Sequence, residues 1–249
     1  MGTRNKIYFA SDFHLGAVSH PDPLEVERKL VRWLNSISAD ARSIYLLGDI
    51  FDFWYELRLA VPKGFTRVLG KLAELNDMGV DIHLFVGNHD VWMFNYLPRE
   101  IGATIHTGSL ITEIEGKKFF LAHGDGLGER PWSFRFIRWI FHNKICQKIY
   151  SSLHPRWSFA LAKLLSRKSR ESGGVEGYRG EQNEELILFA KNYLTEHPEI
   201  DYFVFGHRHI LLDMQLPHDS RLFILGDWLT HFSYLVFDGE SVALEQFEV

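Results

Sequence analysis

The chain has 249 residues, a hydrophobic content of 46% and a formal net charge of −5 at pH 7. A chain of this size and composition can bury a large core, and we expect a single α/β domain. The one cysteine, Cys146, excludes an internal disulfide and a cysteine-rich zinc site, and the acidic balance disfavours duplex nucleic acid as a partner.

The N-terminal residues lack the long apolar segment of a secretory signal, and no run of about 18 apolar residues occurs in the chain. We therefore expect neither a signal peptide nor a transmembrane helix. The chain instead enters an apolar run at residues 6–10 that predicts a first β-strand.

Short apolar runs followed by polar residues predict β-strands. They occupy residues 6–10, 43–47, 82–86, 118–122, 202–205 and 222–225. Because these runs are almost continuously apolar, the strands should be buried on both faces, as in an α/β architecture. Residues 234–249 predict a hairpin that turns at Asp238-Gly239.

Amphipathic helices are predicted between the early strands, at residues 23–37 and 65–79. The apolar face of the first comprises Leu24, Leu30, Trp33, Leu34 and Ile37. The apolar face of the second comprises Phe65, Val68, Leu69, Leu72 and Leu75. A further amphipathic helix is predicted at residues 181–197.

Residues 130–170 contain ten Lys and Arg side chains, eight aromatic side chains and no Asp or Glu. They predict two helices with a break around His154-Pro155, and the glycine-rich residues 171–180 predict a loop. We interpret residues 130–180 as a helical insertion into the single domain, which spans residues 1–249.

Metal-type ligands follow five of the predicted strands. They are Asp12 and His14; Asp49; Asn88 and His89; His123; and His207 and His209. Ligands bind beyond the carboxyl ends of the strands in open α/β sheets, so these side chains should meet at one edge. A single histidine of this kind is more often a hydrogen-bonded core residue, but chance does not readily assemble five such groups in order.

The donor set of carboxylates, an amide oxygen and imidazoles, without thiolate, suits Mn²⁺, Fe or Zn²⁺ better than Ca²⁺. These ligands suffice for two ions if one carboxylate bridges them. A pair of ions about 3.5–4 Å apart lowers the pKa of a bridging water and clamps phosphoryl oxygens, as in phosphatases and nucleases.

The motifs DFH, GDIFDFW, GNHD, HGD and GHRH, from Asp12 to His209, together resemble the calcineurin-like metallophosphoesterase family. The resemblance implies a metallophosphoesterase fold with two packed β-sheets flanked by helices and a dinuclear metal site at the strand ends. The implied ligands of the first ion are Asp12, His14, Asp49 and His209. Those of the second are Asn88, His123, His207 and the bridging Asp49.

The same resemblance implies that His89 is not a ligand. It implies instead that His89 is a catalytic residue that stabilises the transition state or protonates the leaving oxygen, oriented by an acidic residue. Asp52, three residues after Asp49, is the candidate for that second catalytic position. The alternative for Asp52 is a carboxylate that stabilises a helix N-terminus.

Two stretches, LLGDIFDFWYE and LGDWLTHFSYLVFDGESVALEQF, and the insertion resemble the UDP-2,3-diacylglucosamine pyrophosphatase family of lipid A biosynthesis. The resemblance implies a Mn²⁺-dependent cleavage of the pyrophosphate that yields lipid X and UMP, with the insertion as a lid over the acyl chains. It also implies a cytoplasmic protein, peripheral on the inner face of the inner membrane. The chain departs from this family in having His89 rather than Arg and Asp52 rather than Glu.

The insertion combines aromatic side chains at helical spacing with the cations Arg135, Arg138, Lys144 and Lys148. We expect the apolar side chains to receive acyl chains and the cations to meet an anionic membrane surface. The alternative is a helical hairpin that packs on its own domain with a solvated basic face. The candidate substrate-binding residues are Asn88, His89, Arg167, Lys168, Arg170 and Arg179.

Other functions remain open at this point. One is a phosphoesterase that acts on a soluble nucleotide-sugar or another phosphodiester, of which a nuclease is a weaker version. Another is a metallophosphoesterase fold that serves as a binding scaffold without catalysis. The presence of every predicted metal ligand argues against the scaffold.

Overall fold

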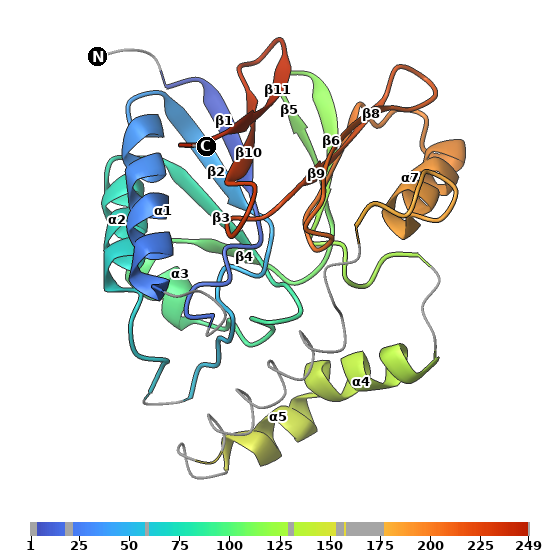
Figure 1. Ribbon diagram of the computed structural model, residues 1–249. Helices are drawn as coiled ribbons and strands as arrows, with labels where there is room; N and C mark the ends of the chain where they lie inside the picture. Colours follow the sequence, from blue (N-terminus) through green and yellow to red (C-terminus); the bar gives the residue numbers. More distant parts are fainter. Residues whose placement is uncertain are drawn as a thin grey trace.

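Two β-sheets form the centre of the computed structural model, which describes residues 4–17, 22–57, 60–128, 132–152, 157 and 177–248 (Figure 1). The first sheet has, in spatial order, β11 (Val242–Gln246), β10 (Ser233–Phe237), β1 (Lys6–Ala10), β2 (Ala41–Leu46), β3 (Asp81–Phe85) and β4 (Thr104–His106). The second has β5 (Leu110–Ile114), β6 (Lys117–Ala122), β7 (Tyr202–Phe205), β9 (Arg221–Leu225) and β8 (Leu211–Gln215). This architecture confirms the predicted α/β fold with two packed sheets.

The central strands are buried on both faces, as their apolar runs predict. Strands β1 to β4 pair in parallel, and β10 pairs antiparallel with β1. In β1, Ile7 and Phe9 belong to the core between the two sheets, whereas Tyr8 and Ala10 belong to the core beneath the helices. Alternate residues therefore enter two different cores, which is why the sequence shows no polar alternation.

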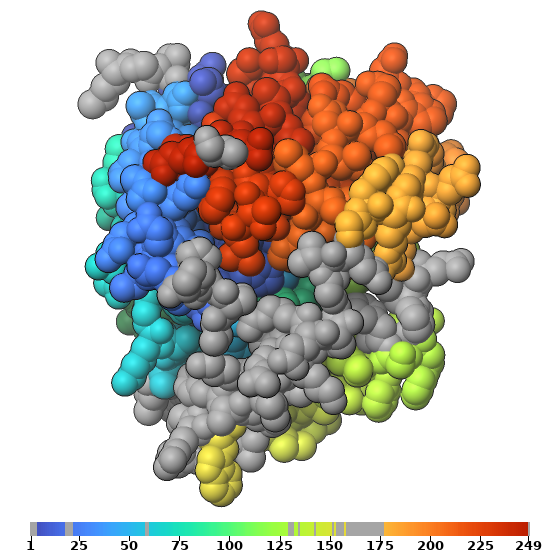
Figure 2. All heavy atoms as spheres, viewed as in Figure 1, coloured from blue at the N-terminus to red at the C-terminus, as the bar shows by residue number. Residues whose placement is uncertain are grey.

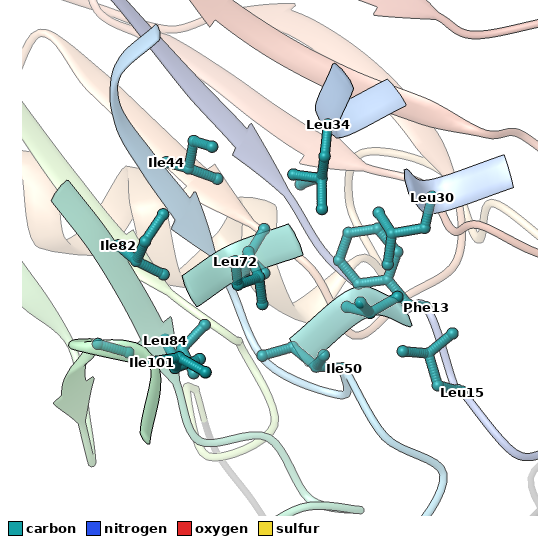
Figure 3. Close-up of a cluster of buried hydrophobic side chains, with 14 of the residues drawn as sticks. Phe13, Leu15, Leu30, Leu34, Ile44, Ile50, Leu72, Ile82, Leu84 and Ile101 are labelled. Carbon is teal, nitrogen blue, oxygen red and sulfur yellow. The ribbon is translucent and has the colours of Figure 1, made fainter. Parts of the chain in front are cut away.

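Three helices cover the outer face of the first sheet (Figure 1): α1 (Pro23–Ile37), α2 (Thr66–Asp77) and α3 (Tyr96–Ile101). The side chain of Asp22 caps α1 by accepting a hydrogen bond from the amide of Leu24, and Pro23 occupies the first turn. Leu30 and Leu34 of α1 belong to the buried core, where Leu30 lies beside Phe13 (Figure 3).

The expectation that Leu24 shares the apolar face of α1 is wrong, because this side chain is 44% exposed. Leu24 precedes Leu30 by six positions, which is about 240° around a helix, so it faces away from the sheet.

The outer face of the second sheet packs against α7 (Glu185–Glu196). Leu186 and Ala190 of this helix lie against Phe203 and Phe205 of β7 in a third cluster of buried side chains. Strands β10 and β11 form the hairpin predicted at Asp238-Gly239.

Two helices from the insertion, α4 (Trp132–His142) and α5 (Lys144–Ser151), lie beyond the carboxyl ends of the parallel strands (Figure 1). They are separated at Asn143, whose side chain caps α5 by accepting hydrogen bonds from the amides of Ile145 and Cys146. The predicted break at His154-Pro155 lies outside the described residues. Among the described helices, none has the length and apolar character needed to span a membrane.

Candidate metal centre

The carboxyl ends of the parallel strands bring side chains from distant parts of the chain together. His14 Nε2 lies 3.2 Å from His209 Nε2, although 195 positions separate the two residues. Asp12 Oδ1 lies 3.8 Å from His14 Nε2 and 3.5 Å from His209 Nε2. These three residues could hold one metal ion.

A second set of donors lies beside the first. His123 Nε2 is 3.2 Å from Asn88 Oδ1 and 3.4 Å from Asp49 Oδ2. The same Asp49 oxygen is 3.8 Å from His14 Nε2, so this carboxylate lies between the two groups, as a bridging ligand must. The ring centroid of His207 lies 5.2 Å from that of His123.

Hydrogen bonds orient two of the imidazoles for metal binding. His123 Nδ1 lies 2.8 Å from the carbonyl oxygen of Leu47. Because a carbonyl oxygen only accepts, Nδ1 carries a proton, and Nε2 is the nitrogen that faces Asp49 and Asn88. His209 Nδ1 lies 3.3 Å from Asp227 Oδ2, which leaves its Nε2 beside Asp12 in the same way.

Asp12 shows most directly that the residues fit divalent ions. Its Oδ1 atom is buried and has no hydrogen-bond partner among the described residues. A buried carboxylate oxygen without a partner is costly unless a cation lies against it. The donors around Asp12 and Asp49 are those that manganese, iron and zinc accept.

Charged groups in the site shift the pKa values of one another. Burial works to raise the pKa of Asp49, but the charges of His123 and His89 prevail and hold that pKa well below its usual range. Burial likewise works to lower the pKa of His123, whereas the Asp49 charge prevails and raises it to about 9. Carboxylates that stabilise positive charge in this way would also attract divalent cations.

The backbone at five of the seven predicted metal ligands is left-handed rather than extended. Positive φ angles occur at Asp12 (57°), His14 (43°), Asp49 (50°), His207 (67°) and His209 (51°). Such angles cost a non-glycine residue about 1–3 kcal/mol and concentrate at functional sites. Tight turns rather than extended backbone therefore aim Asp12 and His14 toward each other, and their amides donate hydrogen bonds to the carbonyl oxygens of Gly48 and Asp49.

Two motif glycines make room for the carboxylates. A Cβ atom on Gly87 would collide with the Asp49 carboxylate, and one on Gly206 would lie 2.6 Å from Asp12 Oδ2. Only glycine permits this approach of backbone to ligand.

Asp90 is a buried residue that is not among the predicted site residues, although it ends the Gly-Asn-His-Asp motif. Its carboxylate accepts hydrogen bonds of 2.8 Å from the amides of Gly87 and Ile50, and so joins the two loops that carry Asn88 and Asp49. Burial, and then the nearby charge of Asp49, raise the pKa of Asp90 to about 7.

Two further acidic residues hold the Gly-His-Arg-His turn and are also absent from the predicted set. Asp227 orients His209, and its other oxygen accepts amide hydrogen bonds from the following turn, including one from Thr230. Glu184, which is buried, pairs with Arg208 through contacts of 2.6 and 3.2 Å. A sequence signal existed for Asp227, because Gly-Asp follows a predicted strand there as it does at Asp49.

His89 lies next to the metal ligands. Its amide donates to Asp49 Oδ1 at 2.9 Å, and its ring meets that of His14 edge-on. Its Nδ1 atom lies 3.1 Å from the backbone carbonyl oxygen of Asp52 and 3.9 Å from the Asp52 carboxylate. Asp52 is thus in place to orient His89, but through its main chain more closely than through its side chain.

The cations of the insertion differ in whether they are exposed or form an ion pair within the domain. Arg135, Lys144 and Lys148 are exposed. Arg138 instead forms an ion pair with the buried Asp125, so the expectation that it faces an anionic surface is wrong. Arg179 is exposed, and the predicted contacts Arg167, Lys168 and Arg170 lie outside the described residues.

Known proteins are similar to this chain along nearly its whole length. A UDP-2,3-diacylglucosamine hydrolase of Porphyromonas gingivalis is 46% identical over 258 residues and covers 98% of each chain. A protein of the same name from Neisseria meningitidis is 29% identical over 97% of this chain and 98% of its own. The solved structure of Yfce, a phosphoesterase from E. coli, covers 98% of this chain and 93% of its own, with 16% identity and a TM-score of 0.47. The family model of calcineurin-like phosphoesterases matches residues 5–211, and the chain belongs to that family.

Proposed function

We propose that this protein hydrolyses UDP-2,3-diacylglucosamine, cleaving its pyrophosphate to lipid X and UMP in lipid A biosynthesis. The observation that carries the proposal is the 46% identity to the P. gingivalis hydrolase of that name over 98% of both chains. A match of that extent includes the insertion as well as the metal-binding motifs. We include the whole chain, residues 1–249, in one domain with the insertion at 130–180 as its lid.

The proposed site uses two divalent ions, and Mn²⁺ is the ion that we expect. The ligands of the first would be Asp12, His14, Asp49 and His209, and those of the second Asp49, Asn88, His123 and His207. Bound ions would supply Lewis acidity at the phosphoryl oxygens and activate the attacking water.

His89 contributes a proton or a hydrogen bond in this proposal. Because its Nδ1 faces the Asp52 carbonyl, Nδ1 carries a proton and Nε2 is left for the substrate. A protonated Nε2 would donate to a phosphoryl oxygen or to the leaving oxygen. Asn88, placed beside His123, would contact the same phosphoryl group.

The exposed apolar side chains of α4 support a lipid-linked substrate and an anionic membrane surface as partners. Trp132, Phe136 and Trp139 stack along one side of α4, and Trp132 is 74% exposed. Figure 2 shows α4 and α5, coloured yellow-green to yellow, at one end of the molecule. Exposed aromatics beside Arg135 and Lys144 are typical of a helix that lies at a membrane surface, here the cytoplasmic face of the inner membrane.

One assay tests the substrate. Purified protein loaded with Mn²⁺ is given UDP-2,3-diacylglucosamine, and UMP is measured against an Asp49→Ala control. We expect UMP from the unmodified protein only, and no comparable turnover of UDP-N-acetylglucosamine, which has no acyl chains. Equal or faster turnover of the soluble sugar would replace the proposal with a soluble nucleotide-sugar hydrolase. Two bound ions without any turnover would indicate a scaffold.

A further inference from the structure

Trp92 connects the metal-binding loops to the helices of the insertion. It follows His89 by three positions, is 5% exposed, and donates a hydrogen bond from its indole Nε1 to the carbonyl oxygen of Phe141 at 2.7 Å. Phe141 lies in the last turn of α4, where carbonyl groups have no partner within the helix. The indole therefore caps the end of α4 from outside the helix.

The same carbonyl joins α4 to α5. Gln147 of α5 donates its side-chain amide to the Phe141 oxygen at 2.9 Å. The two lone pairs of this oxygen are thus used by one donor from α5 and one from the loop of His89. Removal of the indole N–H would leave the two helices joined to each other but would weaken their connection to the metal loops.

Aromatic packing surrounds this hydrogen bond. The ring centroid of Trp92 lies 5.7 Å from that of Phe141, 4.8 Å from that of Tyr150 and 4.7 Å from that of Tyr55. The ring centroids of Tyr55 and Tyr150 are 5.1 Å apart. Tyr55 belongs to the loop that carries Asp49, and it forms an isolated β-bridge with Trp92. Both metal-binding loops therefore meet α4 and α5 at the same aromatic cluster.

A second contact holds α4 one turn earlier. Arg138 pairs with Asp125, two residues after the predicted ligand His123, and the Arg138 guanidinium lies against Gly126. The exposed aromatics Trp132, Phe136 and Trp139 lie on other positions of the helix. Helix α4 is thus held at residues 138 and 141 by two different loops of the metal site, while its apolar stripe stays exposed.

We propose that Trp92 is a positioning residue that sets the distance between the metal site and the acyl-binding surface of the insertion. The inference rests on the proposed function. Metal ions would fix the diphosphate, and α4 would receive the acyl chains. A diacylated substrate can therefore bind at the metal site and at α4 together only if α4 has a defined position relative to the metal site. A phosphodiester without acyl chains uses the metal site alone and does not depend on that place.

The test compares Trp92→Phe with Trp54→Phe. The first keeps an aromatic ring and loses the N–H that binds Phe141. The second is the matched control, because Trp54 is also buried in a metal-site loop but donates to Glu56 within the domain, at 3.3 Å. For Trp92→Phe we expect a roughly three- to tenfold rise in KM for UDP-2,3-diacylglucosamine, the effect of one lost hydrogen bond. The kcat on bis(4-nitrophenyl) phosphate should not change, and Trp54→Phe should not raise KM selectively.

Hydrogen exchange gives a readout that needs no substrate. Amides of residues 132–151 should exchange faster in Trp92→Phe than in the unmodified protein or in Trp54→Phe, with unchanged exchange in β1 to β3. Equal exchange and equal KM in Trp92→Phe would overturn the positioning role, as would a parallel loss on both substrates. If the unmodified protein releases no UMP, the proposed substrate fails. In that case, faster exchange in Trp92→Phe would still establish that Trp92 holds α4 in place, and equal exchange would refute it.

Discussion

His209 Nδ1 lies 3.3 Å from Oδ2 of Asp227, a buried carboxylate whose second oxygen accepts hydrogen bonds from the turn that follows it. The main chain thus holds the carboxylate, and the carboxylate holds the ring. A carboxylate that accepts a hydrogen bond from Nδ1 raises the basicity of a metal-binding imidazole and keeps its Nε2 aimed at the ion.

Replacing this acceptor should weaken the metal site without removing a ligand. We expect Asp227→Asn to lower the affinity for Mn²⁺ by roughly 10- to 100-fold, the usual cost of losing such a partner. Titration calorimetry with Mn²⁺ measures it. The control is Asp213→Asn, an exposed carboxylate that pairs with Arg221. Equal affinity in the unmodified protein and Asp227→Asn would contradict the role of Asp227.

Asp49 lies within reach of both groups of donors, so its loss should affect both ions. We expect Asp49→Ala to retain neither ion and to lose all activity, because each group loses its shared carboxylate. Elemental analysis after gel filtration counts the ions directly. A variant that still holds two ions would show that Asp49 does not bridge.

His89 should matter for rate rather than for metal content. His89→Ala should keep both ions and lose a factor of about 10²–10⁴ in kcat, the range for a positioned acid or base. Metal analysis and turnover are measured on the same sample. An unchanged rate would remove His89 from the reaction, and a lost ion would make it a ligand.

The exposed cations of the insertion should contribute to membrane binding. Each basic residue near an anionic leaflet contributes about 1 kcal/mol, so reversal at Arg135 and Lys144 should weaken vesicle binding by at least about tenfold. Sedimentation with phosphatidylglycerol vesicles measures this, and the effect should shrink in high salt. Paired reversals at Arg28 and Arg67 on α1 and α2 match the change in charge and should have little effect. Identical sedimentation of both double variants would refute the proposed contact.

A histidine pair at the edge of the first sheet should make stability depend on pH. His83 Nδ1 lies 3.0 Å from His106 Nε2, with Tyr45 stacked on His83 and Phe85 on His106. Burial lowers the pKa of both rings, the charge of His106 lowers that of His83 further, and Asp81 opposes this only in part.

The folded state therefore favours neutral rings at this pair. As pH falls below about 6.5, the unfolded chain binds protons before the folded protein does. The free energy of unfolding therefore decreases as pH falls from about 6.5 through the lowered pKa values of the folded state. His83→Gln should reduce this loss, measured as the change in urea midpoint between pH 7.5 and 5.5. The exposed His218, replaced by Asn, is the control. An identical pH dependence in His83→Gln and the unmodified protein would exclude the pair as its source.

Local sequence determined the central apolar strands and the positions of the predicted metal ligands that follow them, but not the peripheral strands β4, β5 and β8. Continuous apolar runs such as residues 6–10 reflect burial of a strand on two faces, and this pattern can be recognised from a few consecutive residues. The ligands Asp12, Asp49 and His123 follow such runs directly, so their meeting at one edge follows from the strands being parallel. The Asn-His-Asp motif placed His89 at the same edge.

Contacts between distant segments were decided only by the tertiary structure. Three buried carboxylates bind to loops that are distant in the sequence: Asp90, Asp227 and Glu184. The residues next to each carboxylate in the sequence do not indicate which loop it binds. Arg138 has the pattern of a surface cation, yet it turns inward because Asp125 is buried beside it. A residue's intrinsic preference is read from its neighbours in sequence, whereas its hydrogen-bond and ion-pair partners exist only once the chain has folded.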